Sequence, residues 1–149
     1  MHIHSVLFIG RRNAARSIMA EACFNSASII GWRAFSAGWQ SQAGVDRLAL
    51  NVLDRHGFPT DALYSKPDDI FRQTGAPDVD LCIFLDDLLP SNVSQYPGVK
   101  EYWRIGDPHG TEDLKQAYED ALGLIMAKTS GLILSGKLVN LAAELRAAG

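Results

Sequence analysis

The chain has 149 residues, 47% of them hydrophobic, which suits one compact domain with a single core. Its net charge of −3 excludes a general attraction to nucleic acid or to an anionic membrane surface, so any anion site must come from a local cluster. The two cysteines, Cys23 and Cys82, lie far apart, which argues against a disulfide scaffold and favours a reducing compartment.

Membrane and secretion signals are not expected in this chain. No apolar run approaches the roughly 20 residues that a membrane-spanning helix needs. The first residues do not show the basic, apolar and small-residue pattern of a secretory leader. We therefore expect a cytoplasmic protein, with no membrane partner and no nucleic-acid partner.

Strand-like and helix-like segments alternate along the chain. In chain order, the predicted elements are a strand over 3–9, a helix over 15–27, a strand over 33–37, a helix over 45–56, a short helix over 68–72, strands over 79–85 and 99–103, and helices over 111–134 and 137–147. Thr111 is the expected N-cap of the long helix that it begins.

This alternation predicts an α/β fold in a single domain over 1–149. We expect a four-stranded parallel sheet with helices on both faces, in a three-layer sandwich, and the helix over 137–147 as a C-terminal extension. Ligands of such sheets bind beyond the carboxyl ends of the strands. Three predicted loops leave those ends, at 10–16, 86–99 and 104–110.

Three arginines, Arg11, Arg12 and Arg16, crowd the start of the first helix. A helix N-terminus carries roughly +0.5 charge, so an exposed cation there costs about 0.3 to 1 kcal/mol. Arg11 and Arg12 could simply extend into water, but Arg16 begins the helix directly behind the loop. We interpret the cluster as an oxyanion site, where guanidinium groups and backbone N–H groups converge on phosphate, arsenate or sulfate. The predicted oxyanion-binding residues are Gly10, Arg11, Arg12, Asn13, Ala14, Ala15, Arg16 and Ser17.

The stretch VLFIGRRNAARSIMAE, residues 6–21, resembles the first loop of the low-molecular-weight protein tyrosine phosphatase superfamily, and most closely that of the thioredoxin-coupled arsenate reductases. That family has a hydrophobic strand, a cysteine, five residues, Arg-Ser, and then a helix with Met-Ala-Glu. The resemblance covers about 130 residues. Its further segments are FSAG (35–38), LALNVLDRHGF (48–58), SKPDDIF (65–71), GAPDVDLCIFL (75–85) and YWRIGDPHGTED (102–113).

The resemblance places the nucleophilic cysteine of the family at Gly10. Glycine has no side chain, so it cannot attack phosphorus or arsenic. Cys23 falls inside the first helix and Cys82 in the middle of a strand, and we interpret both as core residues. The resemblance also implies that the arsenate reductases need further cysteines after the third strand, which relay the reaction from thiol to thiol. Asp86 stands at the nearest matching position, so this relay is missing too.

The resemblance also implies a general acid, because Asp107-Pro108 matches the Asp-Pro pair whose aspartate protonates the leaving group. Without the resemblance, this pair would be read as a turn. We expect Asp107 to face the loop as a vestigial acid. Asp86 and Asp87 leave a strand at the same edge of the sheet and could fill the pocket by pairing with Arg11 or Arg12.

We therefore predict a catalytically degenerate relative that binds a phosphate-like oxyanion, or a phosphorylated partner, at the loop over 10–17. Arg16 would grip the anion, and Asn13 and Ser17 would brace the loop; no cofactor and no metal are predicted. One alternative is an active phosphatase or arsenate reductase that works without cysteine, with Asp107 or Asp86 as the base. Another is an interaction protein whose pocket is blocked.

Two further features leave alternatives open. The helices over 111–134 and 137–147 could hold a surplus apolar face for a homodimer, or they could simply cover the sheet. His2 and His4 are two apart on a strand, so they point to one face. We interpret them as a solvent-exposed pair rather than as a metal site.

Overall fold

The computed structural model describes residues 2–41 and 44–148. In chain order its helices and strands are β1 (His4–Gly10), α1 (Arg16–Ser26), β2 (Trp32–Gly38), α2 (Arg47–Arg55), β3 (Leu81–Phe84), β4 (Val99–Tyr102), α3 (Leu114–Leu134) and α4 (Lys137–Ala148). Short 3-10 helices lie between them at Asp68–Arg72, Val93–Gln95 and Pro108–Gly110. The predicted alternation of strands and helices is confirmed.

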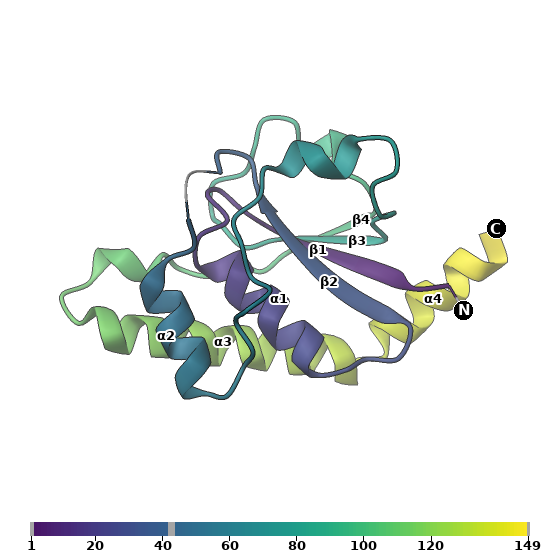
Figure 1. Ribbon diagram of the computed structural model, residues 1–149. Helices are drawn as coiled ribbons and strands as arrows, with labels where there is room; N and C mark the ends of the chain where they lie inside the picture. Colours follow the sequence, from purple (N-terminus) through teal and green to yellow (C-terminus); the bar gives the residue numbers. More distant parts are fainter. Residues whose placement is uncertain (1, 42–43, 149) are drawn as a thin grey trace.

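The four strands form one parallel sheet in the order β2-β1-β3-β4 (Figure 1). β1 is buried along its whole length, as its apolar sequence predicts for a central strand. Gly10 pairs with Gly38 of β2, and Ile9 pairs with Phe84 of β3. The loops that follow β1 and β3 therefore leave the same edge of the sheet as direct neighbours.

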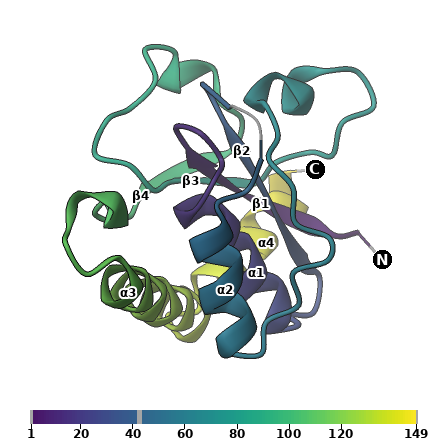
Figure 2. The same ribbon diagram turned by 60° about the vertical axis from the view of Figure 1, so that its left-hand side comes forward.

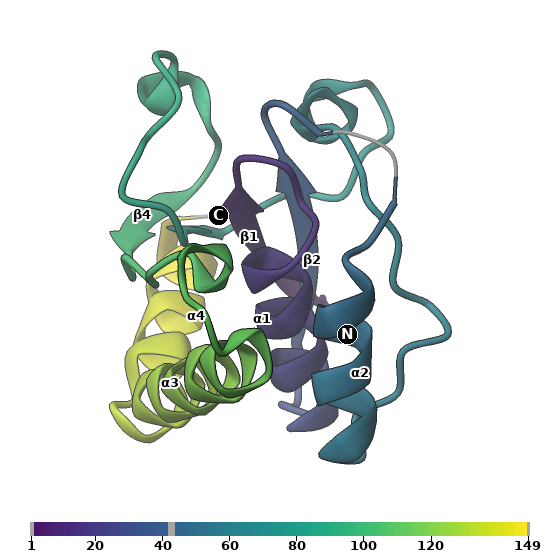
Figure 3. The ribbon, with the colours of Figure 1, turned by 90° about the vertical axis from the view of Figure 1, so that its left-hand side faces the viewer.

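The two faces of the sheet are covered differently. The four α-helices lie on one face (Figures 1 and 2), against a core that includes Val6 and Phe8 of β1. On the other face, Leu7 and Ile9 pack against Phe71 and Tyr96, which belong to the 3-10 helix Asp68–Arg72 and to the segment after Val93–Gln95. Figure 3 shows α1 between α2 on the β2 side and α3 on the β4 side.

The start of α3 differs from its prediction. Asp113, not Thr111, caps this helix, because its carboxylate accepts a hydrogen bond of 3.1 Å from the backbone N–H of Gln116. The chain before it makes the 3-10 helix Pro108–Gly110, after which Thr111 is extended. Asp107 caps that 3-10 helix in turn, through the N–H of His109 at 2.9 Å.

Within residues 2–41 and 44–148, no single helix has the length and apolar character to cross a membrane. The pair formed by α3 and α4 meets that criterion together, but it is bent by 51° at the break between the two helices. The break lies at Ser135 and Gly136, which is the gap between the helices predicted over 111–134 and 137–147.

Candidate functional site

The loop between β1 and α1 packs directly on the end of β2. A Cβ atom on Gly38 would lie 2.7 Å from the carbonyl oxygen of Arg11 and 2.7 Å from the backbone nitrogen of Asn13, too close for any residue except glycine. Beyond Gly38, the backbone N–H of Gln40 donates to the same carbonyl of Arg11 at 2.8 Å. The glycine of the FSAG segment therefore allows the loop to reach its position.

Asn13 holds the turn of this loop. It is buried and has a φ of 54°, a left-handed conformation that asparagine tolerates better than most residues. Its side-chain amide donates to Ser17 Oγ at 2.9 Å, and its side-chain oxygen accepts from the backbone N–H of Lys66 at 2.8 Å. The two residues that we expected to brace the loop are thus in direct contact.

The charged centre of the site is an ion pair between Arg16 and Asp86. The guanidinium of Arg16 contacts the carboxylate of Asp86 and also donates a hydrogen bond of 2.7 Å to the carbonyl oxygen of Ile105. Asp86 Oδ2 accepts a hydrogen bond of 2.8 Å from the backbone N–H of Arg11. Both side chains of the pair are largely buried, with 16% and 13% of their surface exposed. The loop and Arg16 therefore hold a carboxylate of the chain itself.

This ion pair explains why a cation is tolerated at the start of α1. The helix has no acidic residue in its first turn and no side-chain cap. The carboxylate of Asp86, which comes from the neighbouring loop after β3, supplies the negative charge that a helix N-terminus favours. It also neutralises Arg16, the first residue of the helix.

The prediction that Asp86 or Asp87 forms an ion pair with the side chain of Arg11 or Arg12 is wrong, because Asp86 pairs with Arg16 instead. Asp86 uses the backbone of Arg11 and the side chain of Arg16, while the guanidinium of Arg11 donates to Gln40 at 2.8 Å. Arg11, Arg12 and Asp87 are exposed, and within the described part of the chain none of the three forms an ion pair. Asp86 pairs with Arg16 because the side chain of Arg16 is largely buried beside it, whereas Arg11 and Arg12 are exposed.

Gly10 leaves room beside this carboxylate. A Cβ atom built on Gly10 would lie 3.1 Å from Ser17 Oγ and 3.8 Å from Asp86 Oδ2. Cys23 in α1 and Cys82 in β3 are buried, and burial raises the pKa of each thiol to about 12. Both are therefore core residues, as expected, and protonated at neutral pH.

Asp107 lies across the cavity from the loop. This cavity, of about 150 Å³, is lined by residues 10–17 together with Asp86, Leu88, Asp107 and His109. Partial burial raises the pKa of Asp107, but hydrogen bonds from the backbone and ring of His109 and the nearby charge of Arg16 outweigh it, so the pKa is lowered from its ordinary value. Asp107 faces the loop, as we expected, but as a carboxylate rather than as a proton donor.

Comparisons with known proteins place the chain in a family. The family model described as low molecular weight phosphotyrosine protein phosphatase matches residues 5–140. The chain belongs to this family. A comparison with curated protein sequences found no match.

Solved structures from the same group share the fold of the chain. An arsenate reductase described in its phosphate binding state has 26% sequence identity and a TM-score of 0.71, covering 89% of this chain and 98% of its own. An arsenate reductase from Archaeoglobus fulgidus has 27% identity and a TM-score of 0.67, covering 86% of this chain and 98% of its own. A low molecular weight protein tyrosine phosphatase from T. tengcongensis has 30% identity and a TM-score of 0.64, covering 82% of this chain and 95% of its own.

A network behind Asp107 was not foreseen from the sequence. His109 Nδ1 lies 3.1 Å from Asp107 Oδ1, and its Nε2 lies 3.0 Å from Asp46 Oδ2. The hydroxyl of Tyr118, on α3, donates to Asp46 and lies 2.8 Å from His109 Nε2. Asp46 also caps α2, because its carboxylate accepts a hydrogen bond from the backbone N–H of Leu48. Of its contacts, only this capping role could have been predicted from the position of Asp46 before a helix.

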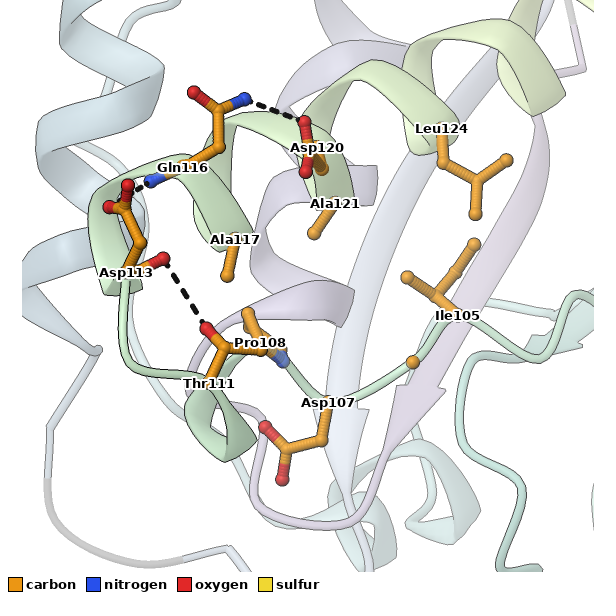
Figure 4. Close-up of a pocket in the computed structure, with 11 residues that line it drawn as sticks. Ile105, Asp107, Pro108, Thr111, Asp113, Gln116, Ala117, Asp120, Ala121 and Leu124 are labelled. Atoms are coloured by element: carbon orange, nitrogen blue, oxygen red, sulfur yellow. Dashed lines mark hydrogen bonds between the residues drawn. The ribbon is translucent and has the colours of Figure 1, made fainter.

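A second cavity, of about 430 Å³, lies on the other side of Asp107, between the segment 105–111 and the start of α3 (Figure 4). Three acidic residues, Asp107, Asp113 and Asp120, are among those that line it, and Gln116 donates to Asp120 at 2.8 Å. The negative charge of three acidic residues around this cavity disfavours an anion there. In this phosphatase-family chain, the smaller cavity over the arginine loop is therefore the candidate anion site.

Proposed function

We propose that this member of the phosphatase family is non-catalytic and binds a phosphate-like oxyanion, free or on a phosphorylated partner, at the loop over 10–17 in competition with Asp86. One observation carries the proposal. The guanidinium of Arg16 and the N–H of Arg11 already hold two anionic oxygens of the Asp86 carboxylate. Such donors suit a phosphate, arsenate or sulfate oxygen pair as well as a carboxylate.

The loss of catalysis is supported by three features of the site. Gly10 offers no nucleophile, and the two cysteines of the chain are buried thiols in α1 and β3. Asp107 has a lowered pKa, which makes it a poor general acid near neutral pH. A route without cysteine would need a general base to activate water. Asp86 is unsuited to that task because Arg16 and the loop amide already engage it.

Oxyanion binding is supported by charge and by similarity. A dianion carries more charge than the single carboxylate that it would displace, and Arg11 and Arg12 add exposed positive charge beside the cavity. One similar structure is an arsenate reductase described as binding phosphate. By analogy, the matching loop of this chain would receive the anion once Asp86 turns outward.

A second candidate function is favoured by the same ion pair. A carboxylate attached to the chain competes at a high effective concentration, because it loses little freedom on binding. If free oxyanions cannot displace it, the loop is permanently closed and the protein acts only as an interaction scaffold. The two candidates differ in one measurable property, the affinity of the wild-type protein for a small oxyanion.

Calorimetric titration with inorganic phosphate and with arsenate tests the proposal. We expect weak binding to the wild type and at least tenfold tighter binding to Asp86→Asn, because asparagine keeps the shape but not the charge. Asp87→Asn is the matched control, since it removes an equal charge from the exposed neighbour and should leave the affinity unchanged. Adding Arg16→Lys to Asp86→Asn should remove the gain, because lysine has no fork of donors.

The outcomes separate the two candidates. Binding to Asp86→Asn but not to the wild type, at any phosphate concentration tested, would favour the closed scaffold. Failure of a folded Asp86→Asn variant to bind either anion would overturn the anion site itself. Turnover of an aryl phosphate, or of arsenate with thioredoxin, above that of the Arg16→Lys variant would overturn the non-catalytic assignment.

A further inference from the structure

A second cluster of ligating side chains lies at the opposite end of β1 from the arginine loop. His2, His4 and Asp80 each offer one donor atom, and these three atoms lie within 4.8 Å of one another. β1 begins at His4 and ends at Gly10 (Figure 1), so at about 3.3 Å per residue the cluster is roughly 20 Å from the loop. It is therefore separate from the proposed oxyanion site.

The interpretation of His2 and His4 as a solvent-exposed pair is wrong for His4. His2 is exposed, but only 6% of His4 is, because Trp32 of β2 packs against its ring with the centroids 5.1 Å apart. His4 Nδ1 is fully buried, and among the described residues it has no hydrogen-bond partner. A buried nitrogen without a partner is costly, which indicates that a ligand belongs there.

The position of Asp80 identifies the kind of ligand. His4 Nδ1 and Asp80 Oδ2 are 3.4 Å apart, beyond the usual 2.7 to 3.2 Å of a hydrogen bond from nitrogen to oxygen. Two ligands at about 2.0 to 2.2 Å from one tetrahedral zinc ion would be separated by about 3.4 Å. The ring of His2 lies edge-on to that of His4, with the centroids 4.6 Å apart. One donor atom of His2 lies within 4.8 Å of the donor atoms of His4 and Asp80.

The buried His4 and the partly buried Asp80 are held in place by backbone hydrogen bonds of the sheet. The backbone N–H of Asp80 donates to the carbonyl of Ser5 at 3.0 Å, and the N–H of Ser5 donates to Asp80 Oδ2 at 3.0 Å. The carbonyl of Asp80 accepts from Val99 at 3.0 Å, and the N–H of His4 donates to Gly31 at 2.8 Å. Of the three proposed ligands only His2 lies outside these hydrogen-bonded segments, so its exposed side chain is the one whose freedom an ion would restrict most.

We propose that His2, His4 and Asp80 bind a divalent zinc-class transition-metal ion, with a remaining coordination position open to solvent beside the exposed His2. Two imidazole nitrogens and one carboxylate oxygen suit Zn²⁺ rather than Ca²⁺ or Mg²⁺, which prefer all-oxygen sites. The ion would tie the segment before β1 to the turn before β3. This assigns the cluster a stabilising role that is independent of the arginine loop.

Calorimetric titration of the chelator-treated full chain with zinc chloride tests the site. We expect one ion per chain, and at least tenfold weaker binding in His2→Gln and in Asp80→Asn. His56→Gln is the matched control, because His56 also faces a carboxylate, that of Glu119 at 2.6 Å, and among residues 2–41 and 44–148 this pair belongs to no group of three metal-ligating side chains. This variant should bind zinc like the wild type.

Asp80→Asn is the decisive variant. Asparagine keeps an oxygen that can accept the N–H of Ser5, so the fold should survive, and thermal unfolding checks this. Zinc should raise the Tm of the wild type and not that of Asp80→Asn, and Co²⁺ should give the visible absorption of a tetrahedral ion only in the wild type. The proposal would be overturned if the wild type bound no zinc, or if Asp80→Asn bound zinc as tightly as the wild type. It would also be overturned if His56→Gln lost as much zinc affinity as Asp80→Asn.

Discussion

Asp86 lies against Arg16 at the carboxyl edge of the sheet, where the loop after β3 meets the start of the helix that follows β1. The carboxylate bridges the guanidinium and the backbone N–H of Arg11. An anion-binding loop of the phosphatase family thus carries an internal anion. Two of the predictions below follow from this arrangement.

Asp86→Asn should lower the free energy of unfolding by about 1 to 2 kcal/mol, because a charge-assisted contact in a largely buried place becomes a neutral one. Phosphate should then raise the Tm of the variant and leave that of the wild type nearly unchanged, since a ligand stabilises the state that binds it. Thermal unfolding with and without phosphate measures both effects. An equal Tm rise in the two proteins would show that Asp86 does not compete with the anion.

Gly10→Cys alone should give little aryl phosphate turnover, and Gly10→Cys combined with Asp86→Asn at least tenfold more. A Cβ atom at position 10 would lie 3.8 Å from Asp86 Oδ2, so the carboxylate would disfavour the thiolate and raise its pKa. Stopped assays of product release measure the rates. The control is Gly10→Ser with Asp86→Asn, which has no thiolate and should be inactive; equal rates for serine and cysteine would contradict the prediction.

Gly38→Ala should destabilise the protein by about 1 to 3 kcal/mol and disturb the loop, because its Cβ would meet the backbone of Arg11 and Asn13 at 2.7 Å. Gly123→Ala in α3 is the control. It has open space around the added atom and should stabilise by up to about 1 kcal/mol, since alanine favours a helix interior. Urea unfolding gives both values, and a neutral Gly38→Ala would mean that the loop can move away without cost.

The buried thiols should be unreactive in the native protein. With pKa values raised by burial from 9.0 to about 12, Cys23 and Cys82 should react with a thiol reagent at pH 8 about 1000-fold more slowly than in urea. A colorimetric thiol assay in buffer and in urea measures this ratio. Rapid reaction of either thiol in the native protein would place it at the surface.

The same shifts make the protein less stable at alkaline pH. Above about pH 9 the unfolded chain loses thiol protons that the folded chain keeps, so each thiol lowers the free energy of unfolding by about 1.4 kcal/mol per pH unit. Between pH 8 and pH 10, the loss of stability in Cys82→Ala should therefore be about 1.4 kcal/mol smaller than in the wild type. Urea unfolding at the two pH values checks the difference, and identical losses would rule out a burial effect.

Local features of the sequence were sufficient to predict the helices and strands and the position of the loop over 10–17. Apolar runs marked β1 and β3 because the central strands of a parallel sheet are buried on both faces, whereas the edge strand β4, VKEY, is largely exposed. Helical spacing marked α1, α2, α3 and α4 to within a few residues. The contact between Asn13 and Ser17 also followed from a short motif. The N-cap of α3 was misplaced, because the 3-10 helix Pro108–Gly110 delays the start of that helix.

Contacts between distant segments could be decided only by the tertiary structure. An α/β chain with an arginine-rich loop at the edge of a parallel sheet could be predicted from the amino-acid sequence alone, since those properties depend on neighbouring residues. Which carboxylate meets Arg16, and which one meets His4, depends instead on β3 lying beside β1, because that pairing brings Asp86 to one end of β1 and Asp80 to the other.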